Sequence, residues 1–141
     1  MIPPLRLLAE DADDLEIISA ALQDAVTRIG DITWERRGRS LTIAFNRFRW
    51  EVPEGRGERV LAGFQLGGVQ GVRARNLRME AKDAVLELLA LTFEAAEAPG
   101  GRVTFAFADG GDLAVDVECV DAALADLCVP WPAPHKPDHE A

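Results

Sequence analysis

The sequence predicts an α+β domain, mostly antiparallel β-sheet that is curled or closed into a small barrel, with one helix near the N-terminus and a short helix near the C-terminus. Three observations support this class. Short segments alternate apolar and polar residues, glycine-rich turns separate them, and only two segments have helical spacing. At 141 residues, 48% of them hydrophobic and 28% charged, the chain has ordinary globular composition and the length of one domain.

The first elements are a short strand and a helix. Residues 5–9 form an apolar run that suits an edge strand. Asp11 is a typical N-cap, and acidic residues follow it in the first turn, where the helix dipole favours them. Leu15, Ile18, Leu22 and Ala25 then share one stripe, so we expect a helix over 12–25 that packs against the sheet.

A β-hairpin follows the helix. Residues 32–36 and 41–45 alternate as strands, and the turn between them centres on Gly38. Beyond Phe45 the alternation changes sides, because aromatic residues then occupy the even positions and arginines the odd ones. A β-bulge near Asn46 would keep Phe48 and Trp50 in the core and would turn Arg47 and Arg49 toward water.

The rest of the chain continues as hairpins. Residues 60–66 and 69–75 form one, joined at Gly67-Gly68, and residues 103–107 and 113–119 form another. We expect an exposed loop over 53–58. Residues 81–97 have the composition of a helix but alternate in pattern, which favours a strand that is buried on both faces.

The C-terminal segment contains the second helical pattern. Asp121 is placed to cap a short helix that docks Leu124, Leu127 and Cys128 on the sheet. We therefore expect a single domain over 1–128 and a proline-rich tail over 129–141, which is extended or disordered unless Trp131 anchors it. This topology permits a pleckstrin-homology-like barrel, although a fold alone does not establish a function.

The charge is unevenly distributed, and this suggests a binding surface. Residues 28–78 carry eleven basic and five acidic residues, whereas the whole chain has a net charge of -9. All the basic residues of this middle segment are arginines, which bind carboxylates and phosphates in bidentate fashion. The candidate ligand-binding residues are the arginines and tryptophans of the hairpins: Trp34, Arg37, Arg39, Arg47, Arg49, Trp50, Arg73 and Arg75.

This pattern predicts that the protein is a small non-enzymatic binding module for an acidic protein or an anionic small molecule. The alternative explanation is that the arginines form an ordinary solvated face and that the tryptophans belong to the core. The net negative charge argues against nucleic acid and anionic membranes as partners. Acidic partners therefore fit the sequence best.

The sequence gives little support to catalysis or metal binding. Serine-hydrolase, phosphate-loop and zinc-protease motifs are missing, and both histidines lie in the tail. Cys119, Cys128, His135 and His139 are zinc-ligand types, but Pro137 prevents a helix from presenting both histidines together. We therefore expect no catalytic residue, metal or cofactor, and we keep a small enzyme or metal-binding protein that uses carboxylates or these residues as the alternative.

The expected location is the cytoplasm. No apolar run approaches the ~20 residues that span a bilayer, and residues 1–6 lack the order of a signal peptide. The two cysteines lie in apolar patterns, where reduced thiols pack as small hydrophobic groups.

Three segments resemble an uncharacterised domain-of-unknown-function family from alphaproteobacteria. They are residues 22–26, Gly30-Asp31 and residues 46–51, and the likeness extends to residues 117–119 and to the tail at 136–140. The resemblance covers almost the whole chain and implies a bacterial cytoplasmic protein. It assigns no catalytic or binding residue.

Overall fold

A computed structural model describes residues 4–52 and 57–133. The chain forms one α-helix, two 3₁₀ turns and eleven strands within these ranges, in the order β1 Arg6–Ala9, α1 Ala12–Ala21, β2 Val26–Arg28, η1 Ile29–Asp31, β3 Ile32–Glu35, β4 Ser40–Phe48, β5 Glu58–Leu66, β6 Val69–Arg75, β7 Val85–Ala95, β8 Gly101–Phe107, η2 Ala108–Gly110, β9 Asp112–Val117, β10 Ala122–Asp126 and β11 Trp131–Pro132.

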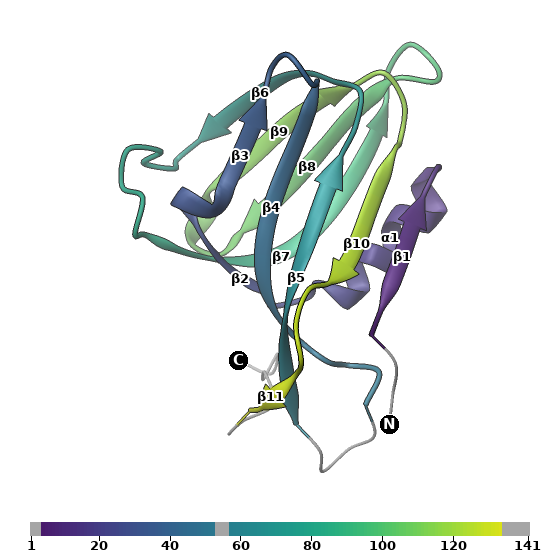
Figure 1. The fold of residues 1–141 in the computed structure, drawn as a ribbon. Coiled ribbons are helices and arrows are strands. Elements are labelled where there is room, and N and C mark those ends of the chain that lie inside the picture. The colour runs from purple at the N-terminus through teal and green to yellow at the C-terminus, as the bar shows by residue number, and fades with distance from the viewer. Residues whose placement is uncertain (1–3, 53–56, 134–141) are drawn as a thin grey trace.

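All strands belong to one curled antiparallel sheet, which confirms the predicted class. The order is β1-β10-β5-β4-β2-β7-β8-β9-β6, with β3 added to β4 and β11 added to β5. In Figure 1 the strands β1, β10, β5, β4 and β3 form a front wall, and β7, β8, β9 and β6 form a back wall. The short β2 joins the walls by pairing with β4 and β7. The sheet is curled but not closed, because its end strands β1 and β6 do not pair with each other.

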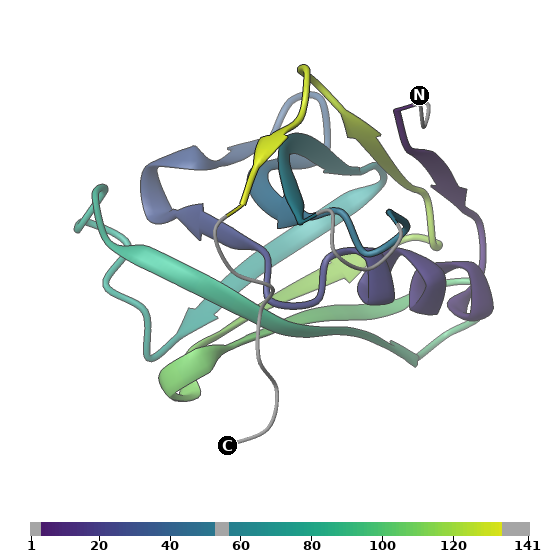
Figure 2. The same ribbon diagram turned by 90° about the horizontal axis from the view of Figure 1, so that it is seen from below.

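The core lies between the two walls. Alternate residues of β4, β5, β8 and β9 face inward and are fully buried, including Phe45, Phe64 and Phe105. The rings of Phe64 and Phe105 meet edge to face with centroids 5.6 Å apart, so aromatic packing joins the front wall to the back wall. The view from below in Figure 2 shows α1 lying across the side of the molecule between the walls.

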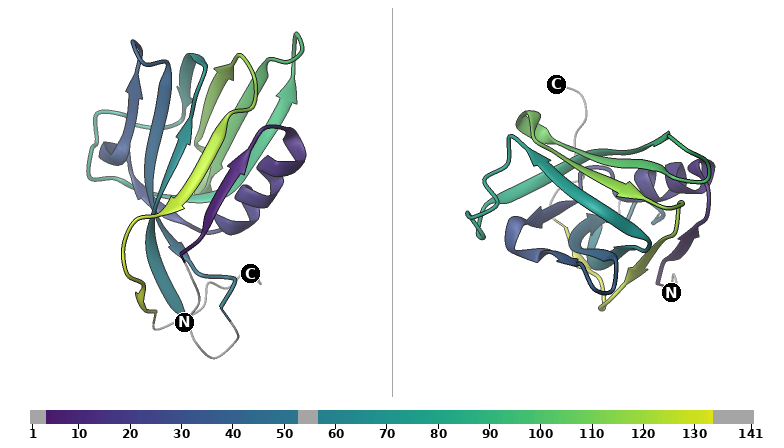
Figure 3. Two further views of the ribbon diagram at one scale, coloured as in Figure 1. Left: turned by 45° about the vertical axis from the view of Figure 1, so that its right-hand side comes forward. Right: turned by 90° about the horizontal axis from the view of Figure 1, so that it is seen from above.

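Helix α1 begins where the sequence predicts and ends earlier. The Asp11 side chain accepts a hydrogen bond from the Asp14 N–H at 2.8 Å, which confirms the N-cap. The helix ends at Ala21, and the chain then turns into the unpredicted strand β2. Leu15, Ile18 and Leu22 are buried against the sheet as expected, and the left view of Figure 3 shows α1 beside β1.

The segment 81–97, whose composition and pattern disagree, contains strand β7, so the prediction of a strand is confirmed. The expectation that both faces are buried is wrong. Leu88 and Leu91 are buried, but Val85 is 63% and Leu89 49% exposed. The outer face of this wall is open to solvent, as is common in antiparallel sheets.

The predicted short C-terminal helix is also wrong, because residues 122–126 form strand β10. This strand pairs with β1 on one side and with β5 on the other. Ala122 and Leu124 alternate onto the buried face, and two neighbouring strands satisfy the backbone, which outweighs the helical spacing. Without that helix and with an open sheet, the pleckstrin-homology-like form stays a prediction.

The predicted bulge at Asn46 is wrong as well. Strand β4 pairs residue by residue with β5 from Leu41 to Phe48 without a register shift. Arg47 therefore stays on the inner face that Leu41, Ile43 and Phe45 occupy. The shifts in this sheet lie between Val69 and Gly71 of β6 and between Leu88 and Ala90 of β7.

The hairpins at 60–75 and 103–119 form as predicted, and the tail begins as a strand. Trp131 lies opposite Arg59 of β5, so β11 anchors the start of the tail. Of the loop predicted over 53–58, residues 53–56 lie outside the described residues, as do His135 and His139. Within the described ranges, neither α1 nor a 3₁₀ turn has the length and hydrophobicity to cross a bilayer.

Candidate functional site

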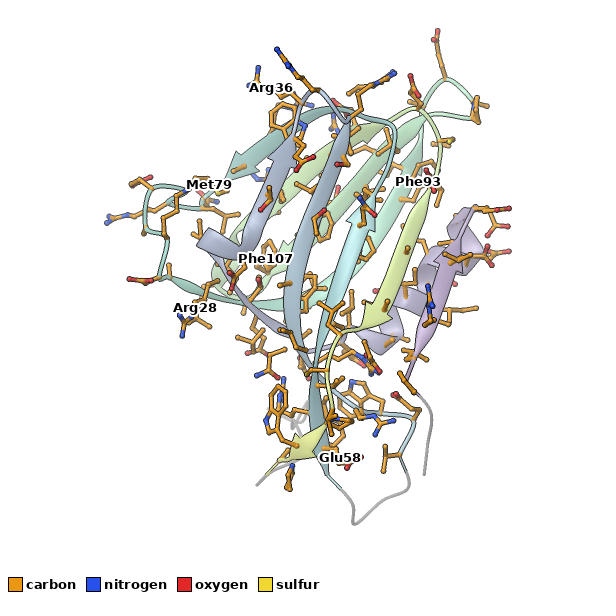
Figure 4. All side chains as sticks on the ribbon, viewed as in Figure 1. Arg28, Arg36, Glu58, Met79, Phe93 and Phe107 are labelled. Carbon is orange, nitrogen blue, oxygen red and sulfur yellow. The ribbon has the colours of Figure 1, made fainter. Side chains whose placement is uncertain are left out.

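The eight predicted residues separate into two groups. Arg47, Arg49 and Trp50 lie at the end of β4 beside the start of β5, whereas the other five lie around the β3–β4 turn and on β6. In Figure 4 the labelled Arg36 marks the β3–β4 turn, and the labelled Glu58 marks the start of β5 at the opposite end of the sheet. Because a strand rises by about 3.3 Å per residue, the length of β4 places the β3–β4 turn roughly 25 Å from the end of β4 where Arg47 and Arg49 lie.

The first group is an internal ion-pair cluster. The Arg47 side chain has no exposed surface and makes bidentate hydrogen bonds with two carboxylates. It donates to both oxygens of Asp126 at 3.0 Å and to the two oxygens of Glu51 at 3.0 and 2.7 Å. Its Nη1 also donates to the Phe48 carbonyl at 3.3 Å. The donors of Arg47 are therefore directed at groups of the same chain.

Arg49 belongs to the same cluster. Its Nη1 donates to Glu58 at 2.8 Å, its Nε lies 3.6 Å from Glu51, and its side chain is only 4% exposed. Two guanidinium groups thus meet the three carboxylates of Glu51, Glu58 and Asp126. This arrangement compensates buried charge and leaves neither arginine on the surface, so the predicted outward orientation of Arg47 and Arg49 is wrong.

These contacts shift the pKa values of Arg47 and Glu51. Burial alone would lower the pKa of Arg47, but the hydrogen bonds and charges of Glu51 and Asp126 outweigh it and raise the pKa. Burial would likewise raise the pKa of Glu51, yet hydrogen bonding and the charges of Arg47 and Arg49 lower it. The contact between Arg47 and Glu51 therefore favours the ionised form of both side chains.

Trp50 supports this end of the sheet by packing. Its ring centroid lies 4.8 Å from that of Phe48, and its Nε1 donates to the Gln23 carbonyl at 3.2 Å. These contacts tie the end of β4 to the end of α1. They match the structural explanation that the sequence left open for the tryptophans.

The second group surrounds a seam between β3 and β6. In the part of the chain that the structure describes, β3 pairs only with β4, and β6 pairs only with β9. Backbone hydrogen bonds delimit the seam: Val69 N–H donates to the Arg39 carbonyl at one end, and Gly30 N–H donates to the Lys82 carbonyl at the other, each at 2.9 Å. Figure 1 shows β3 on the front wall and β6 on the back wall at the same side of the molecule.

Apolar side chains at the seam face inward but are incompletely covered. Ile32 and Trp34 of β3 and Val72 of β6 pack against the core and are half-buried. Ala74 lies opposite Leu113, which is fully buried, and yet Ala74 is exposed. The core is therefore open to solvent along this line, unlike the fully covered interior between β4, β5, β8 and β9.

Arginines surround the seam. Arg36, Arg37 and Arg39 occupy the β3–β4 turn, and the guanidinium carbon of Arg36 lies 4.4 Å from the centroid of the Trp34 ring. Arg39 has a positive φ of 53° and pairs with Glu118. We use the term seam surface for five of the predicted residues: Trp34, Arg37, Arg39, Arg73 and Arg75.

The arginines of β6 remain accessible. Arg73 and Arg75 project from the outer face of β6, and their side chains are 64% and 76% exposed. Arg75 pairs with Asp112, and Arg73 lies 3.9 Å from Asp116. Exposed pairs of this kind contribute at most about 1 kcal/mol, so a partner carboxylate can replace them at small cost.

A cavity of about 490 Å³ lies near the seam surface and is lined by Gln70, Ala96, Glu97, Gly100, Gly101, Asp116, Val117 and Glu118. Its three carboxylates repel anions, so it does not suit an anionic small molecule. Cys119 is half-buried and Cys128 exposed, and both are free thiols. Within the described ranges, no three or more His, Cys, Asp or Glu residues are grouped to hold a metal ion.

The sequence missed the acidic partners of Arg47 and the open edge of β6. A signal for the former was present, because Arg47 and Arg49 continue the odd-numbered inner face of Leu41, Ile43 and Phe45. Glu51, four residues beyond Arg47, was the nearest available carboxylate. No sequence pattern identifies Asp126, since its distance along the chain is 79 residues.

The curled sheet, with α1 across one side and a seam surface on another, defines the chain as a small α+β domain. A family model described as protein of unknown function (DUF2948) matches residues 5–139. The chain belongs to this family, which confirms the resemblance to an uncharacterised family, while its bacterial origin stays a prediction. No curated protein and no solved structure matches the chain.

Proposed function

We propose that this protein is a binding module that recognises an acidic protein partner through the seam surface. The observation that supports this most strongly is the position of Arg73 and Arg75. They are exposed on β6, which among the described residues pairs only with β9, and they lie beside incompletely covered apolar residues. Arginine contacts carboxylates in bidentate geometry, and exposed arginines tolerate exchange of partners.

The arrangement favours a protein over a small anion. The arginines are spread along the turn and β6, and none of them lines the neighbouring cavity, whose wall carries three carboxylates. An elongated acidic surface can contact them at several points, and electrostatic complementarity would also accelerate association. The net charge of -9 makes this basic region the part of the surface most suited to an acidic partner.

The test is a selection of peptides from a displayed random library against the full chain. We expect acidic sequences to be enriched, and their binding to weaken at least about tenfold in Arg73→Glu with Arg75→Glu, since both contacts become repulsive. Arg6→Glu, compared with Arg73→Glu alone, is the matched control, because Arg6 is exposed on β1 at the other end of the strand order and the change in net charge is the same.

Two results would contradict the proposal. Enrichment of basic or neutral peptides would exclude an acidic partner. Equal weakening in Arg6→Glu and Arg73→Glu would show that net charge alone governs binding and that the seam surface is not the site.

A further inference from the structure

We infer that the acidic partner binds as an extended strand along the free edge of β6, with acidic and apolar residues in alternation. This inference rests on the proposed function and adds how the partner is held. Recognition by strand addition obtains affinity from backbone hydrogen bonds and specificity from alternate side chains.

The backbone groups of β9 point alternately to β8 and to β6. Glu118 N–H donates to the Gly68 carbonyl, and Phe107 N–H donates to the Gly111 carbonyl on the other side of β9. Successive residues of a strand direct their backbone groups to opposite sides, so the even-numbered residues of β9 bond β6.

The register between β6 and β9 identifies the backbone groups of β6 that face the seam. Arg73 and Arg75 lie opposite Ala114 and Asp112, which are even-numbered, and their backbone groups therefore belong to the ladder with β9. Val72 and Ala74 alternate with them and direct their N–H and C=O groups to the free edge. Val69 precedes the register shift at Gly71 and lies opposite the odd-numbered Val117, so its N–H also faces this edge, where it donates to the Arg39 carbonyl.

The free edge of β6 would recognise a particular pattern of side chains in the added strand. An added strand would place alternate side chains on the inner face, where Ile32, Val72 and Ala74 are incompletely covered. Its other side chains would lie on the outer face beside the guanidinium groups of Arg73 and Arg75. Opposite charges on neighbouring strands stabilise pairing and like charges oppose it, so this edge excludes basic strands and accepts acidic ones.

Trp34 gives the seam a further polar group. Its Nε1 is buried and has no hydrogen-bond partner among the described residues. Buried donors are usually satisfied, so this unpaired donor marks Trp34 as a side chain whose surroundings an added strand would change. The indole also supplies a spectroscopic probe inside the proposed site.

The probe is a synthetic peptide of about twelve residues that alternates glutamate and valine, titrated into the full chain. We expect binding that changes tryptophan fluorescence, and we expect this change to disappear in Trp34→Phe, because Trp50 and Trp131 lie away from the seam. A lysine–valine peptide and a peptide with its glutamates and valines in separate blocks are the controls, and we expect at least about tenfold weaker binding of both.

The backbone contact is tested from both sides. Ala74→Pro removes an edge N–H without breaking the ladder to β9, and we expect at least about tenfold weaker binding, whereas Ala74→Ser, which keeps the N–H, should bind within about threefold of the original chain. N-methylation of alternate peptide residues gives the same test without changing the protein. Two peptides are compared, one N-methylated at its odd-numbered residues and the other at its even-numbered residues. Only one of them should lose binding, because only one edge of the peptide pairs with β6.

The outcomes separate this inference from the proposed function. Loss of binding in Arg73→Glu with Arg75→Glu, but equal binding by Ala74→Pro and by both N-methylated peptides, would overturn strand addition and leave the acidic partner. Equal binding by all these variants would overturn both. A single-stranded oligonucleotide that displaces the peptide at equal concentration would overturn the assignment to a protein partner.

Discussion

Arg47 and Asp126 are 79 residues apart in the sequence, and their side chains form a bidentate ion pair inside the protein, Nε to Oδ1 and Nη2 to Oδ2, both at 3.0 Å. The Asp126 side chain is 1% exposed and also accepts the Leu5 N–H at 2.8 Å. One carboxylate therefore joins β4, β10 and the residue before β1. This contact connects the middle of the chain to both of its ends.

Replacing Arg47 by methionine should destabilise the fold strongly. Asp126 would remain buried without its counter-charge, and breaking a buried pair on one side typically costs about 3–5 kcal/mol. Chemical denaturation by urea at neutral pH, followed by circular dichroism, measures this change in the free energy of unfolding.

The control is the addition of Asp126→Asn to Arg47→Met. The amide oxygen can still accept the Leu5 N–H but carries no charge, so we expect the double variant to be more stable than Arg47→Met alone. A double variant that is less stable would show that the charge of Asp126 is not what makes Arg47 necessary.

The stability of the protein should fall as the solution becomes acidic, and Glu51 should contribute to this fall. The pKa of Glu51 in the folded chain lies below its ordinary value of 4.5, so its ionised form stabilises the fold above that pH. That contribution is lost as the pH falls through the folded-state pKa. In Glu51→Gln we expect lower stability at neutral pH and a smaller loss on acidification, measured by denaturation at several pH values. An unchanged pH dependence would contradict the coupling of Glu51 to the arginines.

A proline at Ala123 distinguishes strand β10 from the helix that the sequence suggests. In that helix, position 123 would lie in the first turn, where the missing N–H is tolerated. In β10 the residue lies between Leu8 of β1 and Gln65 of β5, so proline breaks a ladder. We expect Ala123→Pro to reduce the thermal unfolding temperature substantially, and a variant as stable as the original chain would contradict the position of β10.

Arg39→Gly should separate stability from binding. Arg39 occupies a left-handed conformation, which costs a residue with a side chain about 1 kcal/mol relative to glycine, and its pair with Glu118 is half-exposed. We therefore expect the variant to unfold at an equal or higher temperature while its affinity for acidic peptides falls. If affinity is unchanged, Arg39 does not belong to the seam surface.

Much of the fold follows from local patterns in the sequence. Alternation predicted β3, β4, β5, β6, β8 and β9, and Asp11 predicted the start of α1, because burial on one face and capping are local requirements. Strand β2 was not predicted, because its three residues are too few to show an alternation of apolar and polar side chains. Residues 122–126 were mistaken for a helix because Leu124 and Leu127 match helical spacing, and only the neighbouring strands β1 and β5 favour the extended form.

The bulge at Asn46 was predicted from the alternation of apolar and polar residues alone. Arginine on an inner face conflicts with binary patterning, so a change of face was the simplest local explanation. The conflict is resolved by Asp126 and Glu51, and a contact over 79 residues cannot be inferred from local pattern. For the candidate site, composition shows that the middle segment is basic, but only the topology separates the buried Arg47 and Arg49 from the exposed Arg73 and Arg75.

The most direct test of the proposed account is amide hydrogen exchange in β6, measured by NMR with and without the alternating glutamate–valine peptide. We expect the N–H groups of Val72 and Ala74 to exchange rapidly in the free protein and to become protected when the peptide binds, while those of Arg73 and Arg75 are protected in both states. Peptide binding that leaves Val72 and Ala74 exchanging as rapidly as before would contradict recognition at this edge.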